Sequence, residues 1–87
     1  MYLIMVYDVN VKRVNKVLKI GRKYLNWIQN SVLEGEITIA KYEKLKMELI
    51  DIINKDEDSV IFYILRTAMY SKREIIGLTK GGSQLII

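Results

Sequence analysis

Asp8 is the residue of this chain that its sequence places best for chemistry. It follows an apolar run from Tyr2 to Tyr7 and stands directly before a strongly basic segment. The chain contains no histidine and no cysteine, so catalysis would have to rest on carboxylates, hydroxyls, amines or a hard cation bound by oxygen atoms. Asp8 is the one acid set among apolar and basic residues. The competing interpretation is that its carboxylate merely caps the helix that follows.

The other acidic residues are weaker candidates for catalysis or metal binding. Glu43, Glu48 and Asp51 are predicted on the exposed face of a helix, and residues 56–58 form an acidic cluster that we expect to be a solvated turn. A lone carboxylate is a weak metal site, because Mg²⁺ usually takes one or two carboxylates together with waters and phosphate oxygens. In a symmetric dimer, two copies of Asp8 could share one ion.

Positive charge is concentrated in the first third of the chain. Residues 1–33 contain six basic residues and one acid, whereas residues 34–87 contain eight basic and nine acidic residues. The net charge of +4 therefore comes from one segment, as expected of a surface that binds a phosphate backbone. An ordinary solvated helix face is the alternative. The six basic residues are Lys12, Arg13, Lys16, Lys19, Arg22 and Lys23.

The elements that must position these residues begin with a strand. Branched and aromatic side chains predict a strand over residues 2–7, and apolar residues at helical spacing predict a helix over residues 11–24. Gly21, within the apolar face of that helix, indicates close packing against a sheet or an early helix end. A two-residue alternation over residues 25–33 predicts a second strand, closed by Gly35.

The second half of the chain begins with a helix. Thr38 is predicted to cap a second helix that extends to about Asn54, and a strand over residues 59–65 follows. The rest is predicted as a loop with Thr67, Tyr70 and Ser71, a strand over residues 73–78, a glycine turn and a short strand over residues 84–87.

This order is close to βαββαβ with an additional C-terminal strand. It predicts one α+β domain over residues 1–87, a ferredoxin-like antiparallel sheet with both helices on one face. Two helices cannot cover both faces and a small domain gains from burying more surface, so we expect a homodimer. The apolar tail of Leu85, Ile86 and Ile87 would extend the neighbour's sheet edge or pair within its own chain.

Composition and motifs narrow the class of protein. The apolar runs reach about seven residues, whereas a membrane-spanning helix needs roughly twenty. We therefore expect a cytoplasmic protein without a membrane partner. The sequence has no glycine-rich phosphate loop, dinucleotide-binding fingerprint or zinc-binding spacing, and the absence of histidine excludes a Ser-His-Asp triad.

Four segments of the chain follow a known pattern: Met1–Val9, the basic helix with Arg13 and Val14, Ile28–Gly35 and Ser59–Leu65. Together they resemble the CRISPR-associated protein two family, the small partners of the CRISPR integrase in spacer acquisition. The resemblance implies a ferredoxin-like fold, a homodimer, an integrase subunit as partner and a role in acquiring new spacers. Some members are described as Mg²⁺-dependent endonucleases on single-stranded RNA or double-stranded DNA.

The resemblance also implies roles for single residues. Asp8 corresponds to the family's metal-binding and catalytic aspartate, with Tyr7 beside it. Arg13 corresponds to a basic position on the first helix, and Ser31 to the serine of the second-strand motif. With Lys12 and Lys16 added from the basic segment, the expected nucleic-acid-binding residues are Tyr7, Lys12, Arg13, Lys16 and Ser31.

Two positions depart from the family pattern. Trp27 stands where many members have arginine, and Leu33 stands where an aromatic residue is usual. Losing the arginine would weaken the positioning of a phosphate. Trp27 would either stack on a base or lie in a buried interface.

The implied reaction is phosphodiester hydrolysis. Two copies of Asp8 would hold a Mg²⁺ ion that lowers the pKa of a bound water, while Lys12 and Arg13 would bind the flanking phosphates. One rival is a non-catalytic dimeric scaffold that bridges CRISPR integrase subunits and holds duplex DNA. A second, from fold analogy alone, is a regulatory domain that binds a small ligand. Metal-dependent cleavage distinguishes the enzyme from both.

Overall fold

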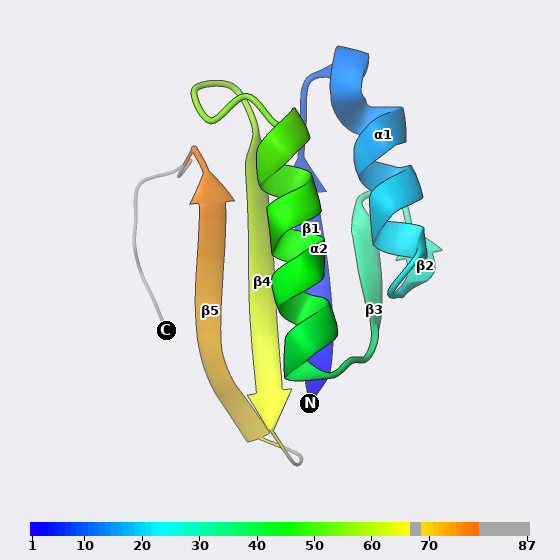
Figure 1. Cartoon of the computed structure of the whole chain (residues 1–87), viewed down its shortest axis with the longest axis vertical. Coiled ribbons are helices and arrows are strands. Elements are labelled where there is room, and N and C mark those ends of the chain that lie inside the picture. The colour runs from blue at the N-terminus through cyan, green and yellow to red at the C-terminus, as the bar shows by residue number, and fades with distance from the viewer. Residues whose placement is uncertain (67–68, 79–87) are drawn as a thin grey trace.

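The chain folds into one antiparallel sheet with two helices packed on the same face (Figure 1). The computed structural model describes residues 1–66 and 69–78. The strand order is β2-β3-β1-β4-β5, which is the ferredoxin-like arrangement with β5 added beside β4, so the predicted α+β fold is confirmed. In chain order the elements are β1 (Tyr2–Asp8), α1 (Val11–Arg22), β2 (Asn26–Gln29), β3 (Val32–Glu36), α2 (Ile39–Ile52), β4 (Ser59–Arg66) and β5 (Met69–Gly77).

Alternating side chains of β1 build the core. Leu3, Met5 and Tyr7 are buried and point toward the helices, because successive residues of a strand face opposite sides of the sheet. A side chain at Gly21 of α1 would place its Cβ 3.0 Å from the side chain of Leu33. The predicted close packing of α1 on the sheet at this glycine is therefore confirmed.

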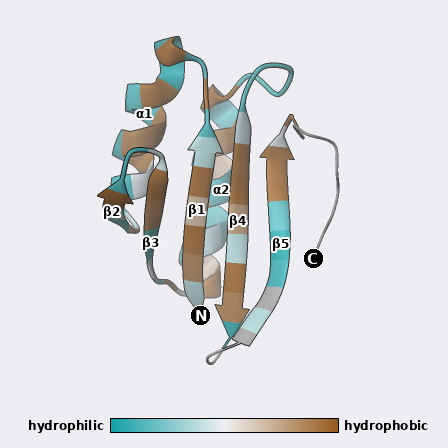
Figure 2. Ribbon diagram, turned by 180° about the vertical axis from the view of Figure 1, so that it is seen from behind, coloured by the Kyte–Doolittle hydropathy of each residue, from teal (hydrophilic) through white to brown (hydrophobic). Residues whose placement is uncertain are grey.

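The centre of the opposite face of the sheet is apolar, and among the described residues no helix covers it, because both helices pack on the other face. Figure 2 views the sheet from this side, with both helices behind it, and colours most of β1 and β4 as hydrophobic. Ile4 and Val6 of β1 stand beside Tyr63 and Ile61 of β4 in the antiparallel register, and all four are only partly buried. We call the surface made by these four residues the open sheet face.

The predicted strand over residues 25–33 is wrong, because this segment is a hairpin. β2 and β3 are joined at Asn30, whose φ of 25° lies in the left-handed region that asparagine tolerates better than most residues. Both arms are extended, so their alternation continues across the turn and resembles one strand. Gly35, predicted to close the strand, lies inside β3.

Other boundaries also differ from prediction. α1 ends at Arg22, two residues early, while Thr38 caps α2 as predicted, since its hydroxyl accepts a hydrogen bond from the N–H of Lys41 at 3.2 Å. β5 begins at Met69, so Tyr70 and Ser71 lie in a strand rather than a loop. Thr67 and the predicted strand over residues 84–87 fall outside the described residues.

In the part of the chain that the structure describes, every helix is too short or too polar to cross a membrane.

Gly77, the last residue of β5, lies against the loop before β4. Gly77 has a φ of +91°, and a Cβ there would lie 2.2 Å from the carbonyl oxygen of Asp58. Only glycine fits this close approach without strain.

Candidate metal and nucleic-acid site at the end of β1

Asp8 is the last residue of β1, a strand with neighbours on both sides. Its side chain is exposed, and the alternation of β1 puts it on the same side of the sheet as Ile4 and Val6. The competing interpretation of Asp8 as a helix cap is wrong. Asn10 caps α1 instead, because its side-chain oxygen accepts a hydrogen bond from the N–H of Lys12 at 2.9 Å.

Tyr7 is buried beside Asp8 on the helix-covered face. Its hydroxyl donates a hydrogen bond to the carbonyl oxygen of Asn30 at 3.3 Å, and its backbone N–H donates to the carbonyl oxygen of Ser31 at 3.1 Å. Burial raises the pKa of the Tyr7 hydroxyl, so the group stays protonated near neutral pH. Tyr7 and Ser31 thus fix the β2–β3 hairpin against the end of β1, and their direct contact with nucleic acid stays a prediction.

Arg13 is held within the protein by two carboxylates. Its Nε lies 2.6 Å from Oδ2 of Asp58, and its Nη2 lies 2.8 Å from Oε1 of Glu57. The hydrogen bonds to Asp58 and Glu57 raise the pKa of the guanidinium. Arg13 therefore joins the first turn of α1 to the loop between α2 and β4, and its predicted contact with phosphate stays a prediction.

Asp58 is the carboxylate that sequence reasoning missed. It was expected in a solvated turn, but it is fully buried. Besides Arg13, its oxygens accept hydrogen bonds from the backbone N–H groups of Asn10 and Asn54, each at 2.8 Å. The Arg13 hydrogen bond, followed by these backbone donors, lowers the pKa of Asp58 to about 2. The expectation of solvent exposure holds for its neighbours Asp56 and Glu57.

Asp58 also holds the end of β5 through its backbone. Its carbonyl oxygen accepts a hydrogen bond from the N–H of Leu78 at 2.7 Å. This residue therefore joins the β1–α1 turn, the end of α2 and the end of β5. The β1–α1 turn follows Asp8 directly, so Asp58 fixes the chain on the C-terminal side of the candidate metal ligand.

The remaining basic residues of α1 face outward. Lys12 and Lys16, both predicted to bind nucleic acid, are exposed, as are Lys19 and Arg22. Because α1 begins within three residues of Asp8, its exposed charges start at the same end of the sheet as that carboxylate. This surface suits a phosphate backbone.

Asp8 fits one part of a Mg²⁺ site. Among the described residues there is no group of three or more potential metal-ligating side chains of the acid, histidine or cysteine type. A single exposed carboxylate nonetheless matches the preference of Mg²⁺ for one or two carboxylates completed by waters and phosphate oxygens. A second copy of Asp8 is the simplest way to strengthen such a site.

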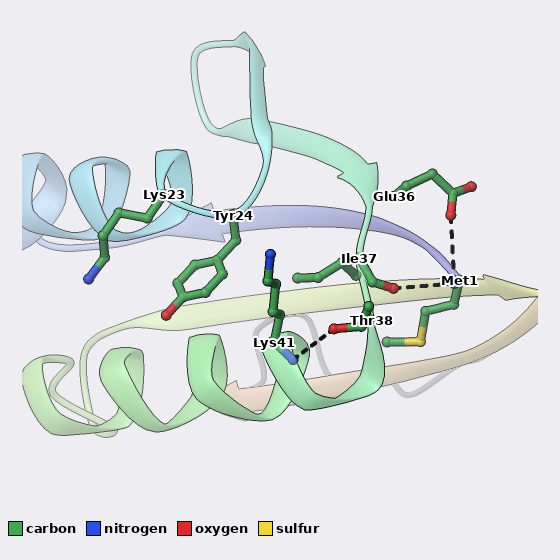
Figure 3. Close-up of a pocket in the computed structure, with 7 residues that line it drawn as sticks. All are labelled: Met1, Lys23, Tyr24, Glu36, Ile37, Thr38 and Lys41. Atoms are coloured by element: carbon green, nitrogen blue, oxygen red, sulfur yellow. Dashed lines mark hydrogen bonds and ion pairs between the residues drawn. The ribbon is translucent and has the colours of Figure 1, made fainter.

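A separate pocket of about 310 Å³ lies at the other end of the sheet (Figure 3). The N-terminal ammonium donates to the carbonyl oxygen of Ile37 at 3.2 Å and lies 3.7 Å from Oε1 of Glu36. Because β1 runs away from this pocket toward Asp8 (Figure 1), the pocket is not part of the candidate site. Its lining residues are Met1, Lys23, Tyr24, Glu36, Ile37, Thr38 and Lys41.

Comparison with known proteins agrees with this geometry. The model of the family described as CRISPR associated protein Cas2 matches residues 1–73. The CRISPR-associated endoribonuclease Cas2 of Dictyoglomus turgidum is 64% identical to this chain, and the match covers the full length of both proteins. It is 58% identical to the protein of the same name from Thermotoga maritima, over 93% of each chain.

Two solved structures extend the likeness to the fold. A crystal structure of Cas2 superposes with a TM-score of 0.75 at 44% identity, covering 100% of this chain and 98% of the other. The Streptococcus pyogenes Cas2 structure gives a TM-score of 0.70 at 36% identity, over 76% of this chain and 87% of that one. The chain therefore belongs to the CRISPR-associated protein Cas2 family.

Proposed function

We propose that this protein is an endoribonuclease of the CRISPR spacer-acquisition machinery that hydrolyses phosphodiester bonds in single-stranded RNA with the help of Mg²⁺ at Asp8. The observation that carries the proposal is an exposed carboxylate at the end of a central strand, at the same end of the sheet where α1 begins with its exposed lysines. The full-length relatives named endoribonucleases support RNA as the substrate.

A homodimer would complete this site. The open sheet face carries Ile4, Val6, Ile61 and Tyr63 in partly exposed positions, and pairing it with a second copy would remove apolar surface from water. Asp8 is on the same side of the sheet. Two chains related by a twofold axis would therefore bring two Asp8 carboxylates toward one another, where both could hold a single ion.

Different residues of the chain would have different roles in the hydrolysis. Asp8 would hold the ion, and Lys12 and Lys16 would bind flanking phosphates as exposed cations. Bound Mg²⁺ supplies a water of lowered pKa and neutralises charge on the scissile phosphate. Arg13 acts indirectly, since its ion pair with Asp58 keeps the turn after Asp8 in place.

The test is cleavage of labelled single-stranded RNA and duplex DNA by wild type and Asp8→Asn, with Mg²⁺ and with a chelator. Asp56→Asn, which removes an exposed acid from the α2–β4 loop, is the matched control. We expect Mg²⁺-dependent RNA cleavage by wild type and the control, and a loss of about 100-fold or more in the Asp8 variant. Chelator-resistant cleavage, or equal rates for wild type and Asp8→Asn, would refute the proposal.

The second candidate is a non-catalytic dimeric scaffold that bridges integrase subunits and holds duplex DNA. It is favoured by the pairing of Arg13 with two carboxylates, which leaves fewer cations for substrate positioning. A scaffold needs the dimer and the basic surface but not Asp8. Wild-type protein that binds duplex DNA and cleaves neither substrate would establish this candidate in place of the enzyme.

A further inference from the structure

Trp27 is an exposed aromatic residue on the edge strand β2. Its side chain is 49% exposed, although burying a tryptophan is strongly favourable. It pairs in register with Leu33, a core residue that contacts α1 at Gly21, so the indole lies on the helix-covered side of the sheet. Its Nε1 donates a hydrogen bond to the carbonyl oxygen of Asn30 at 3.0 Å. The ring is therefore held in one orientation while its surface stays accessible.

The surroundings of this ring are basic. The guanidinium carbon of Arg22 lies 5.6 Å from the ring centroid, within the range of a cation–π contact. Arg22 also borders a hollow of about 310 Å³ on α1 that is lined by Asn15, Leu18 and Lys19. An aromatic face next to exposed cations, here Lys19 and Arg22, is the combination that binds single-stranded nucleic acid.

The same carbonyl oxygen joins this ring to the candidate site. Asn30 accepts hydrogen bonds from the indole of Trp27 and from the hydroxyl of Tyr7, and Tyr7 immediately precedes Asp8 in β1. The hairpin that carries the indole is therefore fixed to the strand that carries the candidate metal ligand.

We propose that Trp27 and Arg22 form a stacking site for an unpaired base of RNA, with Lys19 and Arg22 binding the adjoining phosphates. The inference rests on the proposed action on RNA and deepens it. Bases in a duplex are already stacked on their neighbours, so they cannot cover the indole. The site would accordingly favour single-stranded over double-stranded RNA.

The fluorescence of Trp27 tests the site, because it is the only tryptophan in the chain. The protein is titrated with a uridine oligonucleotide in chelator, so that no cleavage is required, and a labelled copy of the oligonucleotide reports binding by anisotropy. We expect saturable quenching by the single strand and none by an RNA duplex of equal length. Trp27→Ala should weaken single-strand binding by about 5- to 150-fold.

Two variants separate stacking from loss of structure. Trp27→Phe keeps an aromatic face and should bind within about 5-fold of wild type. Ile28→Ala alters an adjacent side chain that is 51% exposed and should bind as wild type does. Oligonucleotide that binds without changing the fluorescence, wild-type affinity in Trp27→Ala, or no binding to wild type at all would overturn the inference. A Trp27→Ala variant that lowers the oligomeric mass with unchanged RNA affinity would show a protein contact instead.

The outcomes also separate this inference from the proposed function. Quenching by RNA in a protein that never cleaves it would refute the nuclease and keep the stacking site. Mg²⁺-dependent cleavage without quenching would refute the stacking site and keep the nuclease.

Discussion

Two aspartates at the same end of the sheet lie in opposite environments. Asp8 ends β1, and its partner across the strands is Ser59, the residue that follows Asp58. Asp58 is fully buried, and its oxygens are bound by Arg13, Asn10 and Asn54, whereas the side chain of Asp8 is exposed. A buried carboxylate that accepts several hydrogen bonds is part of the architecture. An exposed carboxylate at a strand end can be reached by a ligand.

Asp58→Asn should give the largest loss of stability. The NH₂ group of asparagine would face N–H groups that now donate hydrogen bonds to the Asp58 carboxylate. Arg13 would also lose its buried, negatively charged partner. We expect a loss of about 3–5 kcal/mol in the free energy of unfolding, measured by urea denaturation. Glu57→Gln, which changes the exposed partner of the same guanidinium, is the control and should cost less than about 1 kcal/mol. Equal losses in the two variants would contradict the assignment of Asp58 as the anchor.

Gly77→Ala tests the contact between the end of β5 and the same loop. Alanine at a φ of +91° is strained, and its Cβ would overlap the carbonyl oxygen of Asp58, so we expect a loss of about 1–3 kcal/mol. Gly35→Ala is the matched control, because its Cβ would meet nothing nearer than the Asn26 amide nitrogen at 3.4 Å. Equal unfolding midpoints for the two variants would show that the loop moves away from the alanine without a loss of stability.

Acid should weaken the region around Asp58. The pKa of this carboxyl is about 2 in the folded protein, below its ordinary value of 3.8, so the stability it contributes is present above pH 4 or so and is lost as the pH falls toward about 2. Glu74 behaves in the same way, since the hydroxyl of Tyr42 lowers its pKa to about 2. Unfolding free energy measured across this range should fall less steeply in Asp58→Asn than in wild type. The same slope in both proteins would contradict the depressed pKa.

Asp8→Asn should have the smallest effect on stability. Because the side chain is exposed, we expect the unfolding free energy to stay within about 1 kcal/mol of wild type, while cleavage is lost. A loss as large as that of Asp58→Asn would mean that both aspartates are structural and would remove the contrast between them.

The sequence was sufficient to predict the strand that carries Asp8 and the α+β fold with both helices on one face, although it merged β2 and β3 into one strand. Local sequence patterns predict these elements, and tertiary contacts stabilise the same structure. The patterns are the alternation of Leu3, Met5 and Tyr7 in β1 and the helical spacing of apolar residues in α1 and α2. β5 was predicted to begin later than it does because Tyr70 and Ser71 break the apolar run. An edge strand with exposed positions tolerates such polar residues.

The anchoring of the candidate site could not be predicted in the same way. Asp58 belongs to an acidic cluster with Asp56 and Glu57, and composition does not distinguish the buried acid from the exposed ones. The partner that identifies it, Arg13, is 45 residues away in the chain, so only the fold brings the two together. The contact of Arg13 with phosphate, expected from the same charge, stays a prediction.

The central claim is that two copies of Asp8 share one ion, and the number of bound ions tests it most directly. Mn²⁺, a spectroscopically visible substitute for Mg²⁺, is titrated into wild type and Asp8→Asn, and the free ion is followed by electron paramagnetic resonance. We predict one tightly bound ion for every two chains of wild type and none in the variant. One ion per chain, or unchanged binding in Asp8→Asn, would contradict the shared site.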